Sequence, residues 1–322
     1  MVMSSIYNVL FNPVFLFLLI FILSVVLFYE SVIILKKIQF GQVVRDDGPE
    51  THKKKAGTPT MAGIVFIFII LFFEILLLVF KDYINGTKAL KLVIFIVLFG
   101  FIGMIDDYLK VTKKNTKGLP SLFKLILQIV FAGFGLIICF RYNTMSNLIY
   151  FMVLIFIIVG TNNGVNFTDG LDGLCTSVTL IVALLYAMIS YKLDNMEILF
   201  VNLLVIAMLI AFLLFNHYPA KLFMGDTGSL FLGAYVAFMA IELNMEYYLP
   251  LFGFIYMAEV LSVIIQVSYF KLTGGKRFFK MAPIHHHFEK CGFSENKIVI
   301  AFSVVTLFTS VLTYMLYWSF NG

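Results

Sequence analysis

The sequence predicts an all-α protein that crosses a membrane many times. Of its 322 residues, 61% are hydrophobic and only 13% are charged, which is about half the charged fraction of a soluble domain. Uncharged apolar runs, each near the roughly 20 residues that span a bilayer, recur along the whole chain. These observations exclude a soluble enzyme and leave little room for a soluble domain. We therefore expect one integral membrane domain over 1–322.

Ten apolar runs are the candidate transmembrane helices, and their apolar residues cover all faces, as helices in lipid require. In chain order they lie at 14–35, 61–80, 90–105, 122–140, 148–160, 174–191, 198–215, 228–241, 249–270 and 298–319. The residues before the first run lack the basic segment of a secretory signal, and no small-residue cleavage site follows it. We interpret this run as a span that is retained.

Lysine and arginine residues indicate which face is cytoplasmic. Seventeen of the 23 lie in the stretches 36–55, 110–124 and 271–297, and cytoplasmic loops carry an excess of these residues. If the spans alternate, the loops at 161–173 and 216–227 lie on the same face. Both termini are then extracytoplasmic, and a site built from these loops lies at the cytoplasmic membrane face.

Acidic residues cluster at these predicted cytoplasmic ends, where a charge is costly without a partner. Asp106 and Asp107 close the third span. Adjacent helical residues point about 100° apart, so we expect one carboxylate to face a shared cavity. The other would orient it or meet a lysine such as Lys110. Asp226, before the eighth span, is a candidate N-cap that could still offer an oxygen to a metal.

The segment 160–173 alternates polar residues with glycines. Asn166, Asp169 and Asp172 are spaced three apart, so they line one face of a helical or near-helical turn. The spacing of a calcium-binding loop is absent, and a plain turn between spans is the alternative. Carboxylates gathered at one face repel one another unless a cation lies among them. Oxygen ligands favour Mg²⁺ or Mn²⁺, which commonly also bind substrate phosphates.

Two basic motifs are candidate phosphate-binding elements. Thr58 is placed to cap the second span, with Pro59 at its first helical position and Lys55 as a counter-charge for an anion. The sequence GGKR at 274–277 lacks the pattern of a phosphate-binding loop. Three consecutive histidines at 285–287 cannot all converge on one zinc ion, but imidazoles beside a diphosphate can donate hydrogen bonds.

Together these motifs resemble the phospho-N-acetylmuramoyl-pentapeptide transferase family, within the polyprenyl-phosphate N-acetylhexosamine-1-phosphate transferase superfamily. The resemblance covers nearly the whole chain. Its motifs are KAGTPT at 55–60, DDY at 106–108, NFTDGLDG at 166–173, FMGDTGS at 223–229 and PIHHHFE at 283–289. The aspartate motifs occur throughout the superfamily, whereas the triple-histidine motif separates the muramoyl branch from the N-acetylglucosamine branch.

The resemblance implies a transferase of the bacterial cytoplasmic membrane that acts in peptidoglycan synthesis. Undecaprenyl phosphate would attack UDP-N-acetylmuramoyl-pentapeptide, giving the lipid-linked product, lipid I, and UMP. The lipid phosphate is largely ionised at neutral pH, so direct in-line attack is favoured over a covalent intermediate. The implied partners are these two substrates and the bilayer, without nucleic acid; the sequence leaves a homodimer open.

The resemblance also implies roles for individual residues. Mg²⁺ would be the cofactor, held by Asp226 and Asn166. Asp106, Asp107 and Asp226 would be catalytic. The implied substrate-binding residues are Lys55, Thr60, Lys110, Lys114, Asn166, Asp169, Asp172, Asn216, Phe223, His285, His286 and His287.

Two other functions fit parts of the sequence. A related enzyme could pass N-acetylglucosamine phosphate to the same lipid. A cation-coupled transporter could use Glu74 and Glu259, which lie inside predicted spans. A transporter should concentrate ionisable residues near the midplane, whereas most polar residues here gather at one face.

Overall fold

The computed structural model describes residues 13–38, 41, 55, 57–79, 87–113, 118–140 and 147–321. In these residues the regular secondary structure is helical, and the only other pairing is an isolated bridge between Gly41 and Pro59. The all-α prediction is confirmed.

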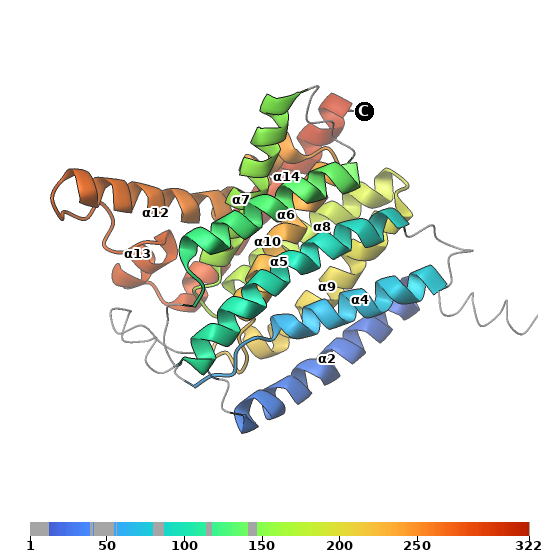
Figure 1. The fold of residues 1–322 in the computed structure, drawn as a ribbon, viewed down its shortest axis with the longest axis horizontal. Coiled ribbons are helices and arrows are strands. Elements are labelled where there is room, and N and C mark those ends of the chain that lie inside the picture. Colours follow the sequence, from blue (N-terminus) through green and yellow to red (C-terminus); the bar gives the residue numbers. More distant parts are fainter. Residues whose placement is uncertain are drawn as a thin grey trace, which may run out of the picture.

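The helices form a bundle from which one arm projects (Figure 1). They are α2 (Pro13–Lys37), α4 (Gly63–Val79), α5 (Thr87–Thr112), α6 (Ser121–Phe140), α7 (Leu148–Thr168), α8 (Leu174–Lys192), α9 (Met196–Asn216), α10 (Gly225–Glu242), η1 (Glu246–Tyr248), α11 (Leu249–Phe252), α12 (Phe254–Leu272), α13 (Ile284–Lys290) and α14 (Glu295–Asn321). The arm consists of α12 and α13.

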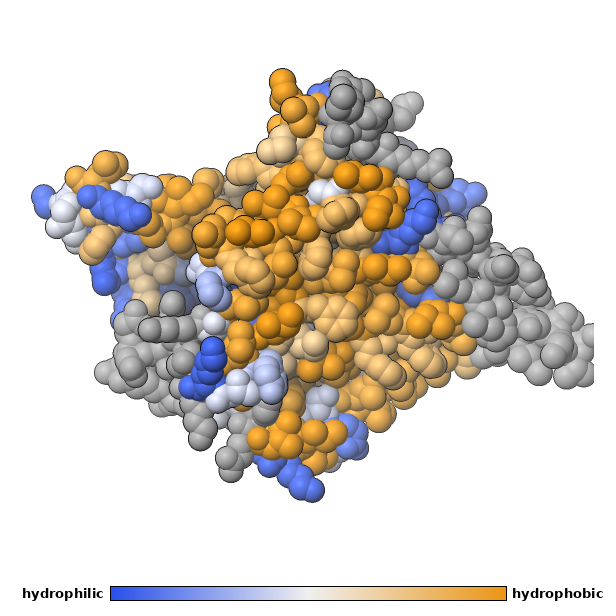
Figure 2. Space-filling model, in the orientation of Figure 1, coloured by the Kyte–Doolittle hydropathy of each residue, from blue (hydrophilic) through white to orange (hydrophobic). Residues whose placement is uncertain are grey.

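Eight of the described helices, α2, α5, α6, α7, α8, α9, α12 and α14, are long and apolar enough to cross a membrane. The described part of α4 is apolar but shorter, and α10 is not among the eight. Figure 2 shows hydrophobic residues covering the middle of one face, with hydrophilic residues toward the edges and on the arm. The chain is therefore a multi-pass membrane protein.

Helix α10 lies inside the bundle and is buried from Thr227 to Glu242. It packs against α4, α5, α7 and α8, because glycines at the crossings let the backbones approach closely. A Cβ atom on Gly103 of α5 would lie 2.1 Å from the backbone oxygen of Asp226. A Cβ on Gly63 of α4 would lie 2.1 Å from the Gly228 nitrogen. The glycines thus fix where α10 begins.

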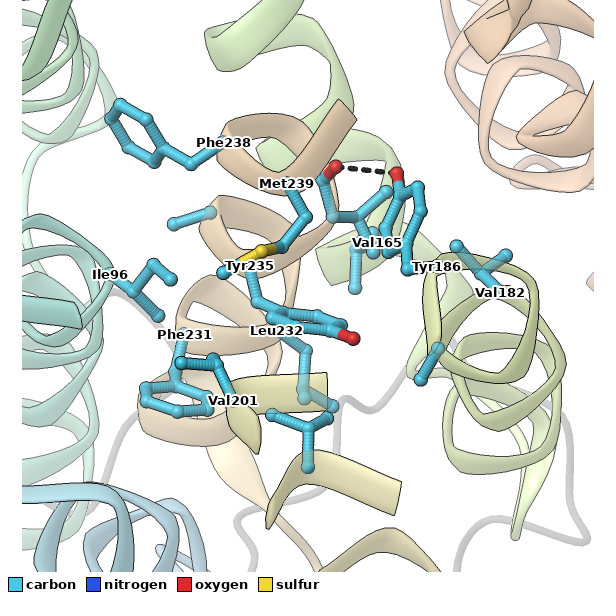
Figure 3. Packing of buried hydrophobic residues seen from close by; sticks show 14 of the residues in the cluster. Ile96, Val165, Val182, Tyr186, Val201, Phe231, Leu232, Tyr235, Phe238 and Met239 are labelled. Carbon is cyan, nitrogen blue, oxygen red and sulfur yellow. Dashed lines mark hydrogen bonds between the residues drawn. The ribbon is translucent and has the colours of Figure 1, made fainter. Parts of the chain in front are cut away.

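The core around α10 combines large apolar side chains with satisfied tyrosine hydroxyls. Figure 3 shows Phe231, Tyr235 and Phe238 packed among residues from neighbouring helices. The Tyr186 hydroxyl donates to the Val236 carbonyl at 2.7 Å, and the Tyr235 hydroxyl donates to Asn202 Oδ1 at 2.7 Å. A buried hydroxyl without such a partner would destabilise the fold.

Gly103→Ala is expected to destabilise the bundle, because the new methyl group would overlap the backbone of α10. Overpacking of this kind costs about 1–3 kcal/mol, so the midpoint of thermal unfolding in detergent should fall. Gly133→Ala in α6 is the matched control, since its Cβ would meet nothing closer than 3.8 Å. Equal unfolding midpoints for the two variants would contradict this packing.

Each of the ten predicted apolar runs overlaps a helix. Helix α5 continues to Thr112 rather than ending near 105, so Asp106 and Asp107 lie inside it and do not close it. Three further differences concern α4, α7 and the ninth run.

Helix α4 begins at Gly63, so Thr58 and Pro59 do not start it. They lie in a segment that pairs with a distant one: Phe223 N–H donates to the Pro59 carbonyl at 2.8 Å and Ala62 N–H to the Phe223 carbonyl at 3.1 Å. The first amide of α4, that of Gly63, donates to the Met224 carbonyl at 3.0 Å and is therefore not available to an anion.

The second and third differences concern α7 and the ninth run. Helix α7 continues to Thr168 rather than ending near 160, because the polar residues there bond to neighbouring helices: Asn162 Nδ2 donates to the Leu230 carbonyl at 2.6 Å. The run 249–270 is divided at Gly253 into α11 and α12.

Candidate active site

Asp107 of α5 caps the N-terminus of α10 from a different helix. Its Oδ1 accepts from the Asp226 N–H at 3.0 Å, and its Oδ2 accepts from the N–H and the hydroxyl of Thr227 at 2.9 and 2.7 Å. A carboxylate at a helix N-terminus satisfies free amides and interacts favourably with the helix dipole. Asp107 thereby fixes the first turn of α10.

The predicted capping role of Asp226 is wrong. Helix α10 begins at Gly225, the residue before it is Met224, and no side chain at that N-cap position bonds to the helix. Asp226 lies inside the first turn, and its own backbone N–H is bonded to Asp107. Its carboxylate is therefore free to point away from the helix end.

The Asp226 carboxylate is the centre of the site. Its Oδ2 lies 2.9 Å from Lys110 Nζ and 2.7 Å from Lys124 Nζ. Its Oδ1 accepts from Asn166 Nδ2 at 3.0 Å, and the same amide donates to Ser229 Oγ at 2.7 Å. Residues from α5, α6, α7 and α10 thus converge on one carboxylate, which is 18% exposed.

Asp106 lies beside this centre. Its Oδ1 accepts from the Leu119 N–H at 2.7 Å, and its Oδ2 is ion-paired with Lys110 Nζ at 2.5 Å. The predicted contact of one of these acids with Lys110 is made by Asp106. Asp107 instead holds the first turn of α10.

These carboxylates fit a divalent cation. Asp106, Asp107 and Asp226 each place one oxygen within 4.8 Å of the others. Both oxygens of Asp107 bond to α10, whereas Asp106 Oδ2 is buried and pairs with Lys110 Nζ. Asn166 donates through Nδ2, which leaves its amide oxygen as a ligand. An all-oxygen donor set of this kind suits Mg²⁺.

A second cluster of charged side chains consists of Lys55, Asp172 and Glu295. Lys55 Nζ lies 2.7 Å from Asp172 Oδ1 and 2.7 Å from Glu295 Oε2. Burial lowers the pKa of Lys55, but its hydrogen bonds to these two acids outweigh burial and hold the pKa above its ordinary value. Lys55 is therefore a charged ammonium with two acidic neighbours.

Asn166, Asp169 and Asp172 do not share one helical face, contrary to the prediction from their spacing. Helix α7 ends at Thr168 and a turn follows, with Gly173 at φ +78°. Asn166 reaches Asp226, whereas Asp172 accepts from the Ala220 N–H at 2.9 Å. The chain reverses between them.

Asp169 lies at the C-cap of α7. Burial raises the pKa of its carboxyl well above the usual range, and the negative charges of Asp226 and Asp107 raise it further. The surroundings of Asp169 therefore disfavour its charged form.

Three other predicted residues line or support this end of the bundle. Asn216 is buried and bonded on both sides: its Oδ1 accepts from Gly173 N–H and the Thr176 hydroxyl, and its Nδ2 donates to the Leu222 carbonyl. Thr60 is buried with a hydroxyl that has no hydrogen-bond partner in the described residues. Phe223 is half-buried beside Pro59. Their substrate contacts stay predictions.

The three histidines occupy α13 and have different partners. His285 is buried against Glu259, with Nδ1 2.9 Å from Oε1. His286 Nδ1 lies 2.7 Å from Glu289 Oε2. His287 Nδ1 accepts from the Lys280 N–H at 3.2 Å. The rings of His285 and His286 lie close together, with centroids 4.1 Å apart, although their bonded partners differ.

Two residues of the site were not predicted from the sequence, and one predicted residue is not among the described residues. Lys124, in the first turn of α6, contacts Asp226 as closely as Lys110 does, and its signal was a single cation at the start of an apolar run. Glu295 completes the pair around Lys55. Lys114 lies outside the described residues.

Comparisons with known proteins agree with one another. Residues 89–244 match the model of the family described as "Glycosyl transferase family 4". The chain is 46% identical over 294 residues to the phospho-N-acetylmuramoyl-pentapeptide-transferase of Carboxydothermus hydrogenoformans, covering 85% of this chain and 89% of that protein. It is 40% identical over 317 residues to the Staphylococcus carnosus protein of the same name, covering 91% and 98%.

Proposed function

The chain belongs to the phospho-N-acetylmuramoyl-pentapeptide-transferase family, and from that premise we propose how its site performs the reaction. The protein transfers phospho-N-acetylmuramoyl-pentapeptide from its UDP-linked donor to undecaprenyl phosphate. The products are undecaprenyl-diphospho-N-acetylmuramoyl-pentapeptide and UMP. This is a membrane step of peptidoglycan synthesis.

The observation that carries this proposal is the convergence on Asp226. Phosphoryl transfer asks a protein mainly for positioning and charge neutralisation. Lys110 and Lys124 place two ammonium groups beside Asp226 and Asp106, where they can hold phosphate oxygens of either substrate. Asp107 and Asn166 hold this arrangement from α5 and α7.

The oxygen donors at this centre support Mg²⁺ as the cofactor. Asp226, Asp106 and the amide oxygen of Asn166 would hold it, since Asp107 is engaged with α10. When bound, Mg²⁺ polarises the diphosphate and stabilises the departing UMP. Asp106 also positions Lys110 beside the attacking lipid phosphate. Because that phosphate is already ionised, Asp106 does not have to act as a strong base.

The arrangement in the membrane follows from the distribution of charge. We propose that α4 and α10 cross the bilayer with the eight longer apolar helices, which gives ten spans in a single domain over 1–322. The end that carries Lys55, Lys110 and Lys124 faces the cytoplasm of a bacterial inner membrane. The prenyl chain then stays in lipid while its phosphate reaches the site from the side.

Substrate turnover by purified protein tests this function. In detergent with undecaprenyl phosphate and Mg²⁺, release of UMP is expected with UDP-N-acetylmuramoyl-pentapeptide and not with UDP-N-acetylglucosamine. Turnover of UDP-N-acetylglucosamine alone would assign the chain to the other branch. Release of UMP without formation of the lipid-linked product would contradict transfer.

His286→Ala is expected to raise the KM for UDP-N-acetylmuramoyl-pentapeptide. Loss of one hydrogen-bonding imidazole is worth about 1–1.5 kcal/mol, or roughly tenfold. The KM for undecaprenyl phosphate should not change. His217→Ala removes an exposed imidazole outside α13 and is the control. Unchanged kinetics in His286→Ala would make that side chain structural.

A further inference from the structure

Glu259 and His285 form an isolated polar pair inside the protein. Glu259 is fully buried on α12, and His285 is 1% exposed on α13. His285 Nδ1 lies 2.9 Å from Glu259 Oε1. The other oxygen of Glu259 and the Nε2 of His285 have no hydrogen-bond partner in the described residues. Among the described residues, this is the only side-chain hydrogen bond that either group makes.

The bond determines which ring nitrogen carries hydrogen. A carboxylate can only accept, so Nδ1 carries the hydrogen and the ring of a neutral His285 keeps a lone pair on Nε2. A carboxylate partner of this kind fixes both the tautomer and the ring orientation. Glu259 thus determines the direction in which the Nε2 edge of His285 points.

That edge contacts the turn between Asp169 and Asp172. A Cβ atom on Gly170 would lie 2.2 Å from His285 Nε2 and 2.6 Å from Cε1. Only a glycine leaves room for the ring here. Asp172, at the end of this turn, pairs with Lys55. The His285 ring therefore contacts the turn that carries Asp172, and Asp172 pairs with Lys55.

The hydrogen bond between Glu259 and His285 links α13 to α12. Helix α13 follows α12 in the arm that projects from the bundle (Figure 1), and its main contacts with other described helices are with α12 and α14. A buried polar pair contributes little net stability compared with apolar packing, but it can specify one arrangement of two elements, because removing one partner leaves the other unsatisfied.

We propose that Glu259 is a positioning residue for the substrate site. Through His285 it holds α13 and the 169–173 turn in the arrangement that receives the nucleotide-linked sugar. This inference rests on the proposed function, since the ligand is the UDP-linked substrate. It gives a role to an acid that would otherwise suggest an ion pathway within the membrane.

Kinetic separation of the two substrates tests this proposal. Glu259→Met removes the acceptor and keeps the side chain similar in size. It is expected to raise the KM for UDP-N-acetylmuramoyl-pentapeptide at least about tenfold. The KM for undecaprenyl phosphate should stay within about twofold, because that phosphate is proposed to bind at the ammonium groups of Lys110 and Lys124. Glu259→Gln retains a neutral acceptor and should give an intermediate value.

Glu246 provides the matched control. It is a buried acid with one oxygen 2.6 Å from the Tyr150 hydroxyl, and its other oxygen has no hydrogen-bond partner among the described residues. Tyr150 lies in the first turn of α7, whereas Asn166 lies in its last, so Glu246 is at the opposite end from the site. Glu246→Met should leave both KM values unchanged.

Gly170→Ala supplies a second variant with Glu259 intact. It should displace the ring of His285 and raise the KM of the same substrate, and calorimetric binding of UDP-N-acetylmuramoyl-pentapeptide without lipid should weaken in parallel. If Glu259→Met does not fold, the KM values of Glu259→Gln and Gly170→Ala test the proposal instead. Equal changes for both substrates, or none, in active variants would overturn the proposal. An inactive wild-type protein would instead contradict the proposed function.

Discussion

Asp226→Asn is expected to lower turnover by at least about a hundredfold, a loss typical of removing one electrostatic group from a site that stabilises transferred charge. The carboxylate is the common neighbour of Lys110, Lys124 and Asn166. An amide of the same shape can accept from one of them but cannot balance two ammonium groups. The variant should also need more Mg²⁺ for half-maximal activity.

The control for this variant separates catalysis from folding. Glu30→Gln neutralises an exposed acid on α2, a helix that contributes none of the site residues described above, and should turn over like the unchanged protein. The two proteins should have similar midpoints of thermal unfolding, because Asp226 does not cap α10. Wild-type turnover in Asp226→Asn would remove this carboxylate from the reaction.

Asp107→Asn is expected to reduce both stability and activity. Its two oxygens accept three hydrogen bonds from the first turn of α10, and an amide must turn its NH₂ group toward one of those donors. Hydrogen bonds to a charged group contribute about 1.5–3 kcal/mol each. The thermal midpoint should fall clearly, and turnover with it, because α10 carries Asp226.

Asp106→Asn is the comparison for this second variant. Asp106 accepts one backbone hydrogen bond, from Leu119, and does not touch α10 through a backbone amide. The Asp106→Asn variant should lose activity, and its thermal midpoint should fall less than that of Asp107→Asn. An Asp107→Asn protein with unchanged stability and no activity would indicate that Asp107 acts on substrate rather than through α10.

The sequence predicted the helices well, because burial in lipid demands long apolar runs whatever their tertiary contacts. Each predicted run overlaps a helix. The errors arose where distant segments satisfy the backbone. Nothing local to Thr58 and Pro59 reveals that their segment bonds to the carbonyl and amide of Phe223, or that cross-helix bonds prolong α7 beyond 160.

The site shows the same division between local and distant information. Residue type and spacing identified Asp106, Asp107 and Asp226, which the fold brings together. The sequence could not show which of these acids caps α10, because capping rules describe a side chain beside its own helix. Here the cap comes from α5, which frees Asp226. Lys124 was missed because one lysine in an apolar run carries no motif.

We propose that Asp226 and Asp106 bind a divalent cation at one end of the bundle. Anomalous scattering from crystals grown with Mn²⁺ locates such an ion. We expect a single peak in contact with these two carboxylates, and its loss in Asp226→Asn. A Mn²⁺-active protein whose crystals show no peak there, or a peak elsewhere, would place the ion outside this site.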